Sequence, residues 1–461
     1  MKRHLSKLAR LLPRGTLRMD SSTLKNNSSD AWMASALPEG VAFPKNTAEV
    51  SKILTFCYRY RIPVTTRGAG RGYVGGCVPV KGGLVLSLVK MNRILEISPR
   101  DGVAVVQPGV ITSKLATTAK RRNLFYPPDP ASLKESTLGG NIATNAGGPR
   151  CLKYGVTRNY VLGLEVVLAD GTVVRVGGRT HKNRTGFDLV GLFTGSEGML
   201  GVVTEATLRL LPLPPTRSAL RAEFSSVEKA AAGVQKILGS GLLPCALEIA
   251  DPFTLAAARK AIPKAPRCNS MLLVEFDGQP TSVKSELAAA AKVLRSSSSR
   301  IFTAHGDIAC ERIWEIRRGF SYALRDTGLV KLNEDVTVPR GRIVDLFHLA
   351  AQLQKKHGIP ISSFGHAGDG NIHVNLMAPV GTQYDDPRMH KILDELFHGV
   401  LKVGGVISGE HGIGLAKKPW WNSASTPALR NLHQRIKRAL DPKNGLNPGK
   451  FLPDTPKQRQ N

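Results

Sequence analysis

Apolar residues follow two different spacings along the first 215 residues. Segments that alternate or run apolar are typical of strands, whereas a spacing of three to four residues is typical of helices. Val50, Ile53, Leu54 and Cys57 fall on one face of a helix for which Thr47 is the expected N-cap. We predict helices at 47–57 and 112–121 and strands at 62–66, 83–88, 94–97, 103–107, 161–168, 172–176 and 201–211.

The prolines Pro212, Pro214 and Pro215 indicate a boundary, after which a second region begins near residue 217. This region has strand patterns at 242–249, 271–276 and 300–304, and helical patterns at 227–238, 282–294 and 309–324. Strands and helices in this order favour an antiparallel sheet with helices on one face. A last amphipathic helix is expected at 431–440.

The composition is that of a globular protein. A chain of 461 residues with 42% hydrophobic residues can form two or three domains with sizeable cores. No apolar run approaches the roughly 18 residues of a membrane span. The six cysteines are scattered without a Cys-x-x-Cys pair, which argues against an iron–sulfur cluster or zinc knuckle in this chain. Without a visible secretory signal, a reducing cytoplasm is the simplest compartment.

The net charge of +29 is unusual. Such a charge can attract nucleic acid, an anionic membrane or acidic substrates. No basic motif interleaved with aromatic residues is present, so we expect a solvated basic surface and no nucleic-acid partner. Peripheral contact with anionic lipid or an acidic partner subunit stays open. Residues 1–19 carry six Lys and Arg and no acid, which suits a transit peptide, a lipid-facing helix or, as we favour, a short helix that begins the fold.

Two glycine-rich stretches suggest a bound cofactor. Residues 128–154 contain glycine pairs at 139–140 and 147–148 around small polar side chains. Glycine lets the backbone come close to a ligand. Residues 63–76 contain a second cluster, in which Gly68, Gly70 and Gly72 alternate with other residues. Strand-like residues follow this cluster, so it is not the dinucleotide fingerprint that opens a helix, and a loop of backbone amides around a pyrophosphate fits better.

The second region carries the polar side chains most suited to catalysis. Arg317 and Ser321 are four residues apart, hence on one helical face, and a guanidinium can bind a carboxylate through two hydrogen bonds. His366 and His373 would lie on opposite faces of a regular strand, but the bend at 368–370 can bring the two imidazoles together. Joined by the later carboxylate of Glu410, they point to a divalent metal.

Taken together, these motifs resemble one family. The chain is similar from about residue 42 to 452 to the FAD-linked D-2-hydroxy-acid dehydrogenases of the vanillyl-alcohol-oxidase fold, which include the flavin subunit of glycolate oxidase, D-lactate dehydrogenase and D-2-hydroxyglutarate dehydrogenase. The matching segments are Arg67-Gly-Ala-Gly70, Pro128-Asp-Pro130, Gly139 to Gly148, Lys153-Tyr-Gly155, Gly195-Ser-Glu-Gly198 and Gly201-Val-Val-Thr-Glu205. Arg71 departs from the pattern, because relatives usually have a small residue there.

The resemblance implies an α+β fold: a two-lobed FAD-binding domain of the p-cresol methylhydroxylase type with an inserted cap of antiparallel sheet and helices. The expected divisions are a helical lead at 1–36, the FAD domain at 37–215, the cap at 216–425 and a C-terminal return at 426–461. The residues expected at the FAD are Arg67, Gly68, Ala69, Gly70, Gly72, Gly75, Gly76, Pro128, Asp129, Ser132, Gly139, Gly140, Asn141, Asn145, Gly147, Gly148, Tyr154, Gly155, Gly201, Val202 and Asn447.

The resemblance also implies a reaction. A small D-2-hydroxy acid, with glycolate and D-lactate favoured, would be oxidised to the 2-oxo acid by hydride transfer to the flavin. His411 would be the catalytic base. The substrate-binding residues would be Arg317, Ser321, Lys331 and Asn375. The metal ligands would be His366, His373 and Glu410, with zinc favoured and manganese or iron left open.

Other roles and partners stay open at this stage. The alternatives are a non-catalytic flavin subunit of a multisubunit oxidase and, less favoured, a basic protein that binds nucleic acid or membranes. Electrons would pass to an acceptor or to partner flavin and iron–sulfur subunits, and a homodimer is an option. The expected location is cytoplasmic, with peripheral contact to the inner membrane as an option, or mitochondrial in a eukaryote.

Overall fold

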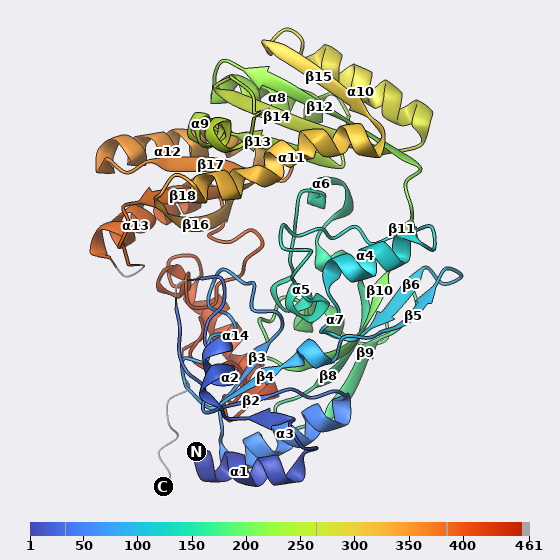
Figure 1. Ribbon diagram of the computed structural model, residues 1–461, viewed down its shortest axis with the longest axis vertical. Coiled ribbons are helices and arrows are strands. Elements are labelled where there is room, and N and C mark those ends of the chain that lie inside the picture. The colour runs from blue at the N-terminus through green and yellow to red at the C-terminus, as the bar shows by residue number, and fades with distance from the viewer. Residues whose placement is uncertain (33, 264, 384–385, 454–461) are drawn as a thin grey trace. The chain divides into compact units, whose positions relative to one another are not determined.

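The computed structural model describes residues 1–32, 34–263, 265–383 and 386–453 (Figure 1). The described chain divides into two compact units. Unit 1 consists of residues 1–146, 156–213 and 410 onward, and unit 2 consists of residues 147–155 and 214–409. The predicted boundary at 215/216 lies two residues beyond the first division, whereas the return to unit 1 begins at Glu410 and not at residue 426.

Unit 1 has a small sheet built largely of parallel strands. Its order in the described chain is β1-β2-β4-β3, in which β2 and β3 run parallel to β4 and β1 runs antiparallel to β2. The strands are β1 (Leu17–Arg18), β2 (Gly40–Ala42), β3 (Val64–Arg67) and β4 (Leu84–Ser87). The accompanying helices are α1 (Lys2–Leu11), α2 (Ser21–Asn26), α3 (Thr47–Tyr60) and the 3₁₀ turn η1 (Leu88–Lys90).

The basic N-terminal helix is part of this unit. Leu5 and Leu8 of α1 are fully buried in the same hydrophobic core as Val50, Ile53 and Leu54 of α3. Burying an aliphatic side chain stabilises a fold by roughly 1.5–3 kcal/mol. The favoured interpretation of residues 1–19, a helix that begins the fold, therefore agrees with the packing.

A second sheet of unit 1 is antiparallel throughout, in the order β5-β6-β10-β8-β9 for the described residues. Its strands are β5 (Ile94–Ser98), β6 (Val103–Val106), β8 (Val161–Val167), β9 (Val173–Gly177) and β10 (Val202–Arg209). The remaining elements of unit 1 are β7 (Leu124–Phe125), β11 (Leu211–Pro212), α4 (Thr112–Lys120), α5 (Leu138–Thr144), η2 (Thr157–Tyr160), α7 (Leu189–Phe193), η4 (Lys418–Trp420) and α14 (Pro427–Leu440).

The C-terminal segment is anchored in unit 1. Leu446 forms a parallel bridge with Val64 of β3. The buried Lys437 Nζ donates hydrogen bonds to Asp441 Oδ2 at 2.6 Å and to the carbonyl oxygens of Met199 and Leu446 at 2.8 Å. A buried ammonium is tolerated only with such partners, so this lysine ties the end of α14 to the rest of the unit.

Unit 2 is built on one antiparallel sheet, which in the described chain has the order β15-β12-β14-β13-β17-β18-β16. Its strands are β12 (Thr216–Phe224), β13 (Ala246–Ala250), β14 (Ser270–Gly278), β15 (Arg300–His305), β16 (Val330–Thr337), β17 (Ile361–His366) and β18 (Asn371–Ala378). Its helices are α6 (Cys151–Tyr154), α8 (Val227–Gly239), α9 (Pro252–Ala261), α10 (Pro280–Leu294), α11 (Gly306–Arg325), η3 (Arg340–Arg342), α12 (Ile343–His357) and α13 (Pro387–Lys402).

Helices cover both faces of this sheet (Figure 1), so the expectation of helices on one face is wrong. Residues of α9 and α11 share a core with Leu273 and Phe364. On the opposite face, Leu272 and Phe224 border Gly233 of α8 and Leu294 of α10. Every residue of β13 and of β18 is buried. Burial at every position of a strand indicates cover on both faces, whereas cover on one face gives alternation.

No described helix is long and apolar enough to cross a membrane. The six cysteines, all within the described residues, are free thiols.

Candidate active site

The two histidines of unit 2 meet on one face of the sheet. β17 and β18 form a hairpin in which Phe364 pairs with His373 and His366 pairs with Asn371. The chain reverses at residues 367–370, so positions seven apart in sequence return to the same face. The two ring centroids are 5.4 Å apart with the planes at 83°, and a ring nitrogen of each lies within 4.8 Å of the other. The glycine bend brings the imidazoles together, as the sequence indicated.

This turn has little room for side chains. A Cβ added at Gly368 would lie 2.5 Å from Leu152 Cδ2, and one at Gly370 would lie 2.1 Å from the carbonyl oxygen of Val338. Leu152 belongs to the segment 147–155, which is therefore packed into unit 2. Four residues expected at the FAD lie in this segment: Gly147, Gly148, Tyr154 and Gly155.

The segment 147–155 is also held by polar contacts within unit 2. Asp277 Oδ1 accepts hydrogen bonds from Lys153 Nζ at 2.6 Å and from the Tyr154 hydroxyl at 2.9 Å. Burial raises the pKa of Tyr154, and the neighbouring Asp277 carboxylate raises it further. The tyrosine is thus a hydrogen-bond donor at neutral pH.

A carboxylate that the sequence analysis did not single out lies at the centre of this site. Glu248 of β13 is 1% exposed. Its Oε1 is 2.6 Å from His366 Nδ1 and its Oε2 accepts a hydrogen bond from Arg317 Nε at 2.5 Å. Burial would raise the pKa of Glu248, but the charges of Arg317 and His366 outweigh it and lower the pKa to about 2. Glu248 is therefore an acceptor for both groups at every physiological pH.

Arg317 is held by packing as well as by this ion pair. Its guanidinium carbon lies 4.8 Å from the ring centre of Phe364 and 5.8 Å from that of Phe320. Guanidinium groups stack favourably on aromatic rings. Arg317 is thus fixed in orientation, unlike its neighbour Arg318, whose half-exposed side chain pairs with Glu311.

The other residues expected at the substrate lie on the same face of the sheet. Lys331 Nζ donates a hydrogen bond to Ser321 Oγ at 2.7 Å. Burial lowers the pKa of Lys331 to about 8, and the nearby Arg325 contributes. Asn375 is fully buried, and its amide bonds Asn333 Nδ2 at 2.6 Å and the backbone of β17 and β18. The Asn375 side chain is therefore fixed between Asn333 and the two strands.

A second buried acid fixes the start of the Ser408–His411 motif. Asp335 of β16 is fully buried and accepts hydrogen bonds from the backbone N–H of Gly409 at 2.8 Å and from Ser408 Oγ at 3.3 Å. Asp335 pairs directly with His373 across β16 and β18. Glu410 follows Gly409 immediately, so its Cα lies about 3.8 Å from the Cα of Gly409.

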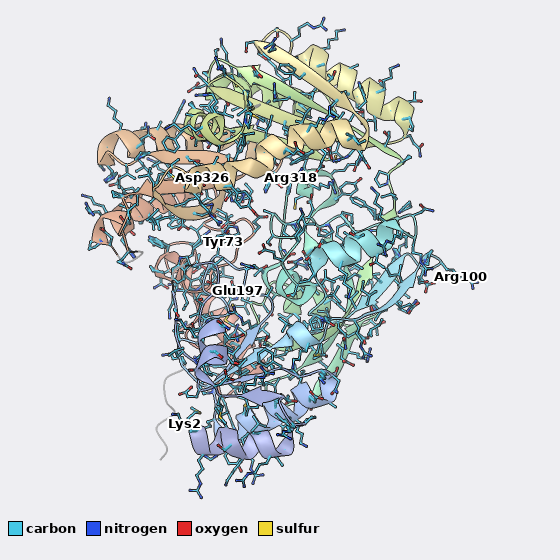
Figure 2. All side chains as sticks on the ribbon, viewed as in Figure 1. Lys2, Tyr73, Arg100, Glu197, Arg318 and Asp326 are labelled. Atoms are coloured by element: carbon cyan, nitrogen blue, oxygen red, sulfur yellow. The ribbon has the colours of Figure 1, made fainter. Side chains whose placement is uncertain are left out.

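In unit 1, His411 lies on the ring of Tyr73. The two ring centroids are 5.3 Å apart with the planes at 25°, and Glu410 Oε1 is 3.9 Å from His411 Nε2. The buried Glu197 accepts hydrogen bonds from the N–H groups of Ile413 and Gly414 at 2.9 and 2.8 Å. Tyr73 and Glu197 are labelled in Figure 2. Burial raises the pKa of Glu197, although these two N–H groups oppose the shift.

The glycine-rich loop 67–76 of unit 1 is a candidate for backbone contact with a ligand. Arg67 is buried, and its Nη1 donates to the carbonyl oxygen of Ser29 at 2.7 Å. Side chains added at Gly68 or Gly70 would collide with Thr137 or with Arg67 itself. In contrast, added Cβ atoms at Gly72, Gly76 and Gly140 would meet no atom closer than 3.3 Å. The backbone at these three positions is less closely surrounded than at Gly68 and Gly70, which suits a ligand that lies against it.

Several residues expected at the FAD make hydrogen bonds within unit 1. Asn447 Oδ1 accepts from the Thr66 N–H at 2.9 Å, and its Nδ2 donates to the Glu197 carbonyl oxygen at 2.6 Å. Asn141 Nδ2 donates to Thr112 Oγ1, and Asn145 Oδ1 accepts from the Arg158 N–H, each at 2.8 Å. Further expected residues in unit 1 are Ala69, Gly75, Pro128, Asp129, Ser132, Gly139, Gly201 and the buried Val202.

Arg71, the departure from the family pattern, forms an ion pair with Glu135 at 2.6 Å, and both side chains are more than half exposed. Such a surface pair contributes little to stability.

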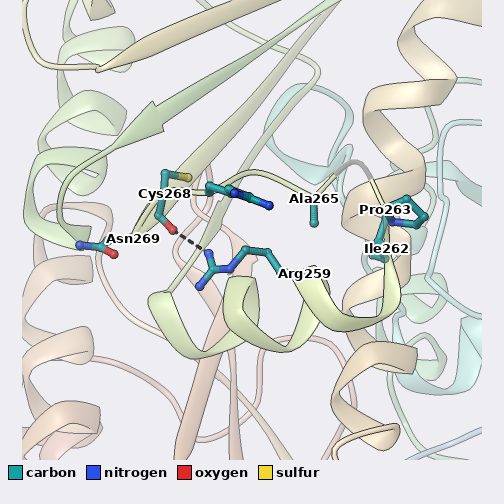
Figure 3. Close-up of a pocket in the computed structure, with 7 residues that line it drawn as sticks. Arg259, Ile262, Pro263, Ala265, Cys268 and Asn269 are labelled. Atoms are coloured by element: carbon teal, nitrogen blue, oxygen red, sulfur yellow. Dashed lines mark hydrogen bonds between the residues drawn. The ribbon is translucent and has the colours of Figure 1, made fainter.

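A separate cavity of about 510 Å³ lies beside α9 in unit 2 (Figure 3). Arg259 Nη1 donates to the carbonyl oxygen of Cys268 at 3.2 Å across its wall. None of the residues assigned to FAD, metal or substrate lines this cavity.

Known protein families match both regions of the chain. The description "FAD binding domain" matches residues 38–177, and "FAD linked oxidases, C-terminal domain" matches residues 213–451. The glycolate oxidase subunit GlcD of Bacillus subtilis is 39% identical over 92% of this chain and 91% of its own length. A D-lactate dehydrogenase of Anaerostipes hadrus is 34% identical over 90% of each chain.

Solved structures give the same fold. A p-cresol methylhydroxylase is 20% identical with a TM-score of 0.82 and covers 98% of this chain and 96% of its own. The 4-ethylphenol oxidase of Gulosibacter chungangensis is 21% identical with a TM-score of 0.79 and covers 97% and 96%. The predicted α+β fold of the p-cresol methylhydroxylase type is confirmed.

We predict that Glu197→Ala lowers the free energy of unfolding by about 1–3 kcal/mol, because the partly buried N–H of Ile413 and the buried N–H of Gly414 lose their acceptor. Chemical denaturation measures this. The control is Glu205→Ala, which removes one of the two carboxylate partners of the exposed Arg175, the other being Glu165, and should change stability by less than about 1 kcal/mol. Equal losses in the two variants would contradict the anchoring role of Glu197.

Proposed function

This chain belongs to the family of FAD-linked oxidases, and from that premise we propose that it oxidises a small 2-hydroxy acid to the 2-oxo acid with FAD as the hydride acceptor. The names of the relatives support glycolate and D-lactate as substrates. The observation that carries the proposal is the shared carboxylate of Glu248, which joins a carboxylate-binding arginine to an imidazole of the kind that binds metals.

FAD would lie against unit 1. We assign its binding to the loop 67–76 and to residues 139–140, because the backbone at Gly72, Gly76 and Gly140 is less closely surrounded than at Gly68 and Gly70 and can lie close to a ligand. When bound, the flavin ring supplies the hydride acceptor. Within unit 1, the buried Arg67 and the side chain of Asn447 hold the backbone of the loop in place.

A divalent metal would be held by His366, His373 and Glu410. Two imidazoles and a carboxylate are a ligand set that zinc prefers, while manganese and iron also accept it. The contact with Glu248 supports this assignment, because metal-binding histidines usually donate their second ring N–H to a carboxylate. When bound, the metal would act as a Lewis acid toward the substrate hydroxyl.

Residues of the chain itself would bind and deprotonate the substrate. Arg317 would hold the substrate carboxylate with its terminal nitrogens, and Lys331, positioned by Ser321, would add a second positive charge. His411 would accept the hydroxyl proton at a ring nitrogen, a role that suits a group titrating near neutral pH. The stacking of Tyr73 on His411 would keep the imidazole in one orientation.

We also propose that the electrons leave through a partner. The relatives of Bacillus subtilis and Escherichia coli are named as subunits, which supports an assembly with further subunits. The six free cysteines of this chain suit a reducing cytoplasm. The charge of +29 would favour an acidic partner.

The assignment of Arg317 predicts a contrast between neighbouring arginines. Arg317→Lys should lower kcat/KM for glycolate or D-lactate about 10–100-fold, because a lysine cannot replace the fixed guanidinium. Arg318→Lys, on the same helix and labelled in Figure 2, should leave kcat/KM within about twofold. Steady-state assays with an electron-accepting dye measure both. Equal losses would contradict the role of Arg317, and a wild-type protein that oxidises neither acid would contradict the proposed activity.

The pKa of Lys331, about 8, predicts a pH effect on substrate binding. The protonated ammonium attracts the substrate carboxylate and is lost as the pH rises through this pKa. We therefore expect kcat/KM to decline above about pH 8, since this quantity reports groups of the free enzyme. Lys331→Arg, which stays charged, should abolish the decline. A decline of the same size in Lys331→Arg would rule out Lys331 as its cause.

A further inference from the structure

The carboxylate of Glu248 serves two site residues at once. Its Oε1 is 2.6 Å from His366 Nδ1, and its Oε2 is 2.5 Å from Arg317 Nε. It reaches His366 directly across the sheet, because Glu248 and His366 are paired residues of β13 and β17. Arg317 approaches from α11, which packs on the same face of the sheet as Phe364. One side chain thus connects a helix to a strand at the site.

The contact with His366 determines which ring nitrogen carries the proton and which carries the lone pair that a metal requires. A carboxylate without a proton can only accept, so His366 Nδ1 must carry the hydrogen. In the neutral ring, the lone pair then lies on Nε2. Glu248 therefore sets both the orientation of the imidazole and the nitrogen that it offers.

The contact with Arg317 determines how the guanidinium is presented. Its Nε is used by Glu248, and the ring of Phe364 lies 4.8 Å from the guanidinium carbon. The two terminal nitrogens have no hydrogen bond to any described residue of unit 2, so they are the ones that a ligand carboxylate can meet. Without Glu248, the guanidinium could rotate around its stem.

We propose that Glu248 is a positioning residue that orients His366 toward a divalent metal and Arg317 toward the substrate carboxylate, so that both affinities depend on one side chain. This inference rests on the proposed function. It adds to that function a residue that touches neither metal nor substrate.

A matched control exists on the neighbouring strand. Glu275 of β14 is also fully buried on this face, and it also binds an arginine, Arg217, at 3.1 Å. Its other partners are Trp314 Nε1 at 2.6 Å, Cys245 Sγ at 3.6 Å and Arg150 Nη2 at 3.8 Å. None of these partners is a residue of the proposed metal or substrate site. Glu275→Gln therefore reports the general cost of neutralising a buried carboxylate in this sheet.

The test compares wild type, Glu248→Gln and Glu275→Gln as purified FAD-loaded proteins. In Glu248→Gln, the amide can donate to His366 Nδ1 and move the ring proton to Nε2. We expect the affinity for Zn²⁺, measured by competition with a chelator in the absence of substrate, to fall about 10–100-fold. We expect KM for glycolate or D-lactate to rise at least about tenfold in the same variant. Glu275→Gln should keep the Zn²⁺ affinity and the KM within about threefold of wild type, even if its melting temperature falls as much as that of Glu248→Gln.

Each outcome of this comparison either supports or refutes the positioning role of Glu248. Loss of both affinities in Glu248→Gln alone supports the proposal. Loss of only one affinity, or equal losses in Glu275→Gln, overturns it. If Glu248→Gln does not fold, Glu248→Asp, which keeps the charge but is one methylene shorter, replaces it, and unchanged affinities there overturn the proposal. A wild-type protein that binds no Zn²⁺ or oxidises neither acid refutes the proposed function and this inference with it, whereas a wild type that does both, beside a Glu248→Gln variant that loses neither affinity, refutes the inference alone.

Discussion

A carboxylate buried in an apolar sheet requires partners, and the site of unit 2 is organised around that requirement. Moving an ionised carboxylate out of water costs several kcal/mol unless charges and hydrogen bonds replace the lost hydration. Glu248 meets this cost with Arg317 on one oxygen and His366 on the other. The contacts that replace the hydration of Glu248 therefore also hold Arg317 and His366 in place, and they allow a charged residue to lie in the buried strand β13.

Two other buried acids also bind neighbouring groups, in their case backbone N–H groups. Asp335 holds the backbone of Gly409, and Glu197 holds the backbone of Ile413 and Gly414. The motif Ser408–His411 thus lies between two backbone anchors, each a buried acid that accepts N–H groups. Such contacts fix a loop more firmly than side-chain packing alone, because an unsatisfied buried acceptor or donor is costly. Gly409 is thereby held within unit 2, and Ile413 and Gly414 are held within unit 1.

Much of this arrangement could be predicted from the sequence, because it depends on local patterns. The alternation of strands and helices, the glycine loops and the family motifs gave the fold, and the glycine bend after His366 correctly brought two imidazoles together. The coverage of both sheet faces was missed, although the uninterrupted apolar run Met271–Val274 in β14 was a signal for it. Glu248 was missed for a different reason: its partners lie 69 and 118 residues away. A lone acid in the apolar stretch Ala246–Ala250 was the available signal, but only the strand register and the packing of α11 reveal what it binds.

The account predicts most directly that a bound flavin is reduced by a 2-hydroxy acid. The decisive measurement is the visible absorption spectrum of the purified protein, followed without oxygen during addition of glycolate, D-lactate and L-lactate. We expect an FAD spectrum whose long-wavelength band bleaches with glycolate or D-lactate and not with L-lactate. A bound flavin that none of these acids bleaches would contradict the proposed reaction, and a protein that binds no FAD when it is supplied would contradict the account as a whole.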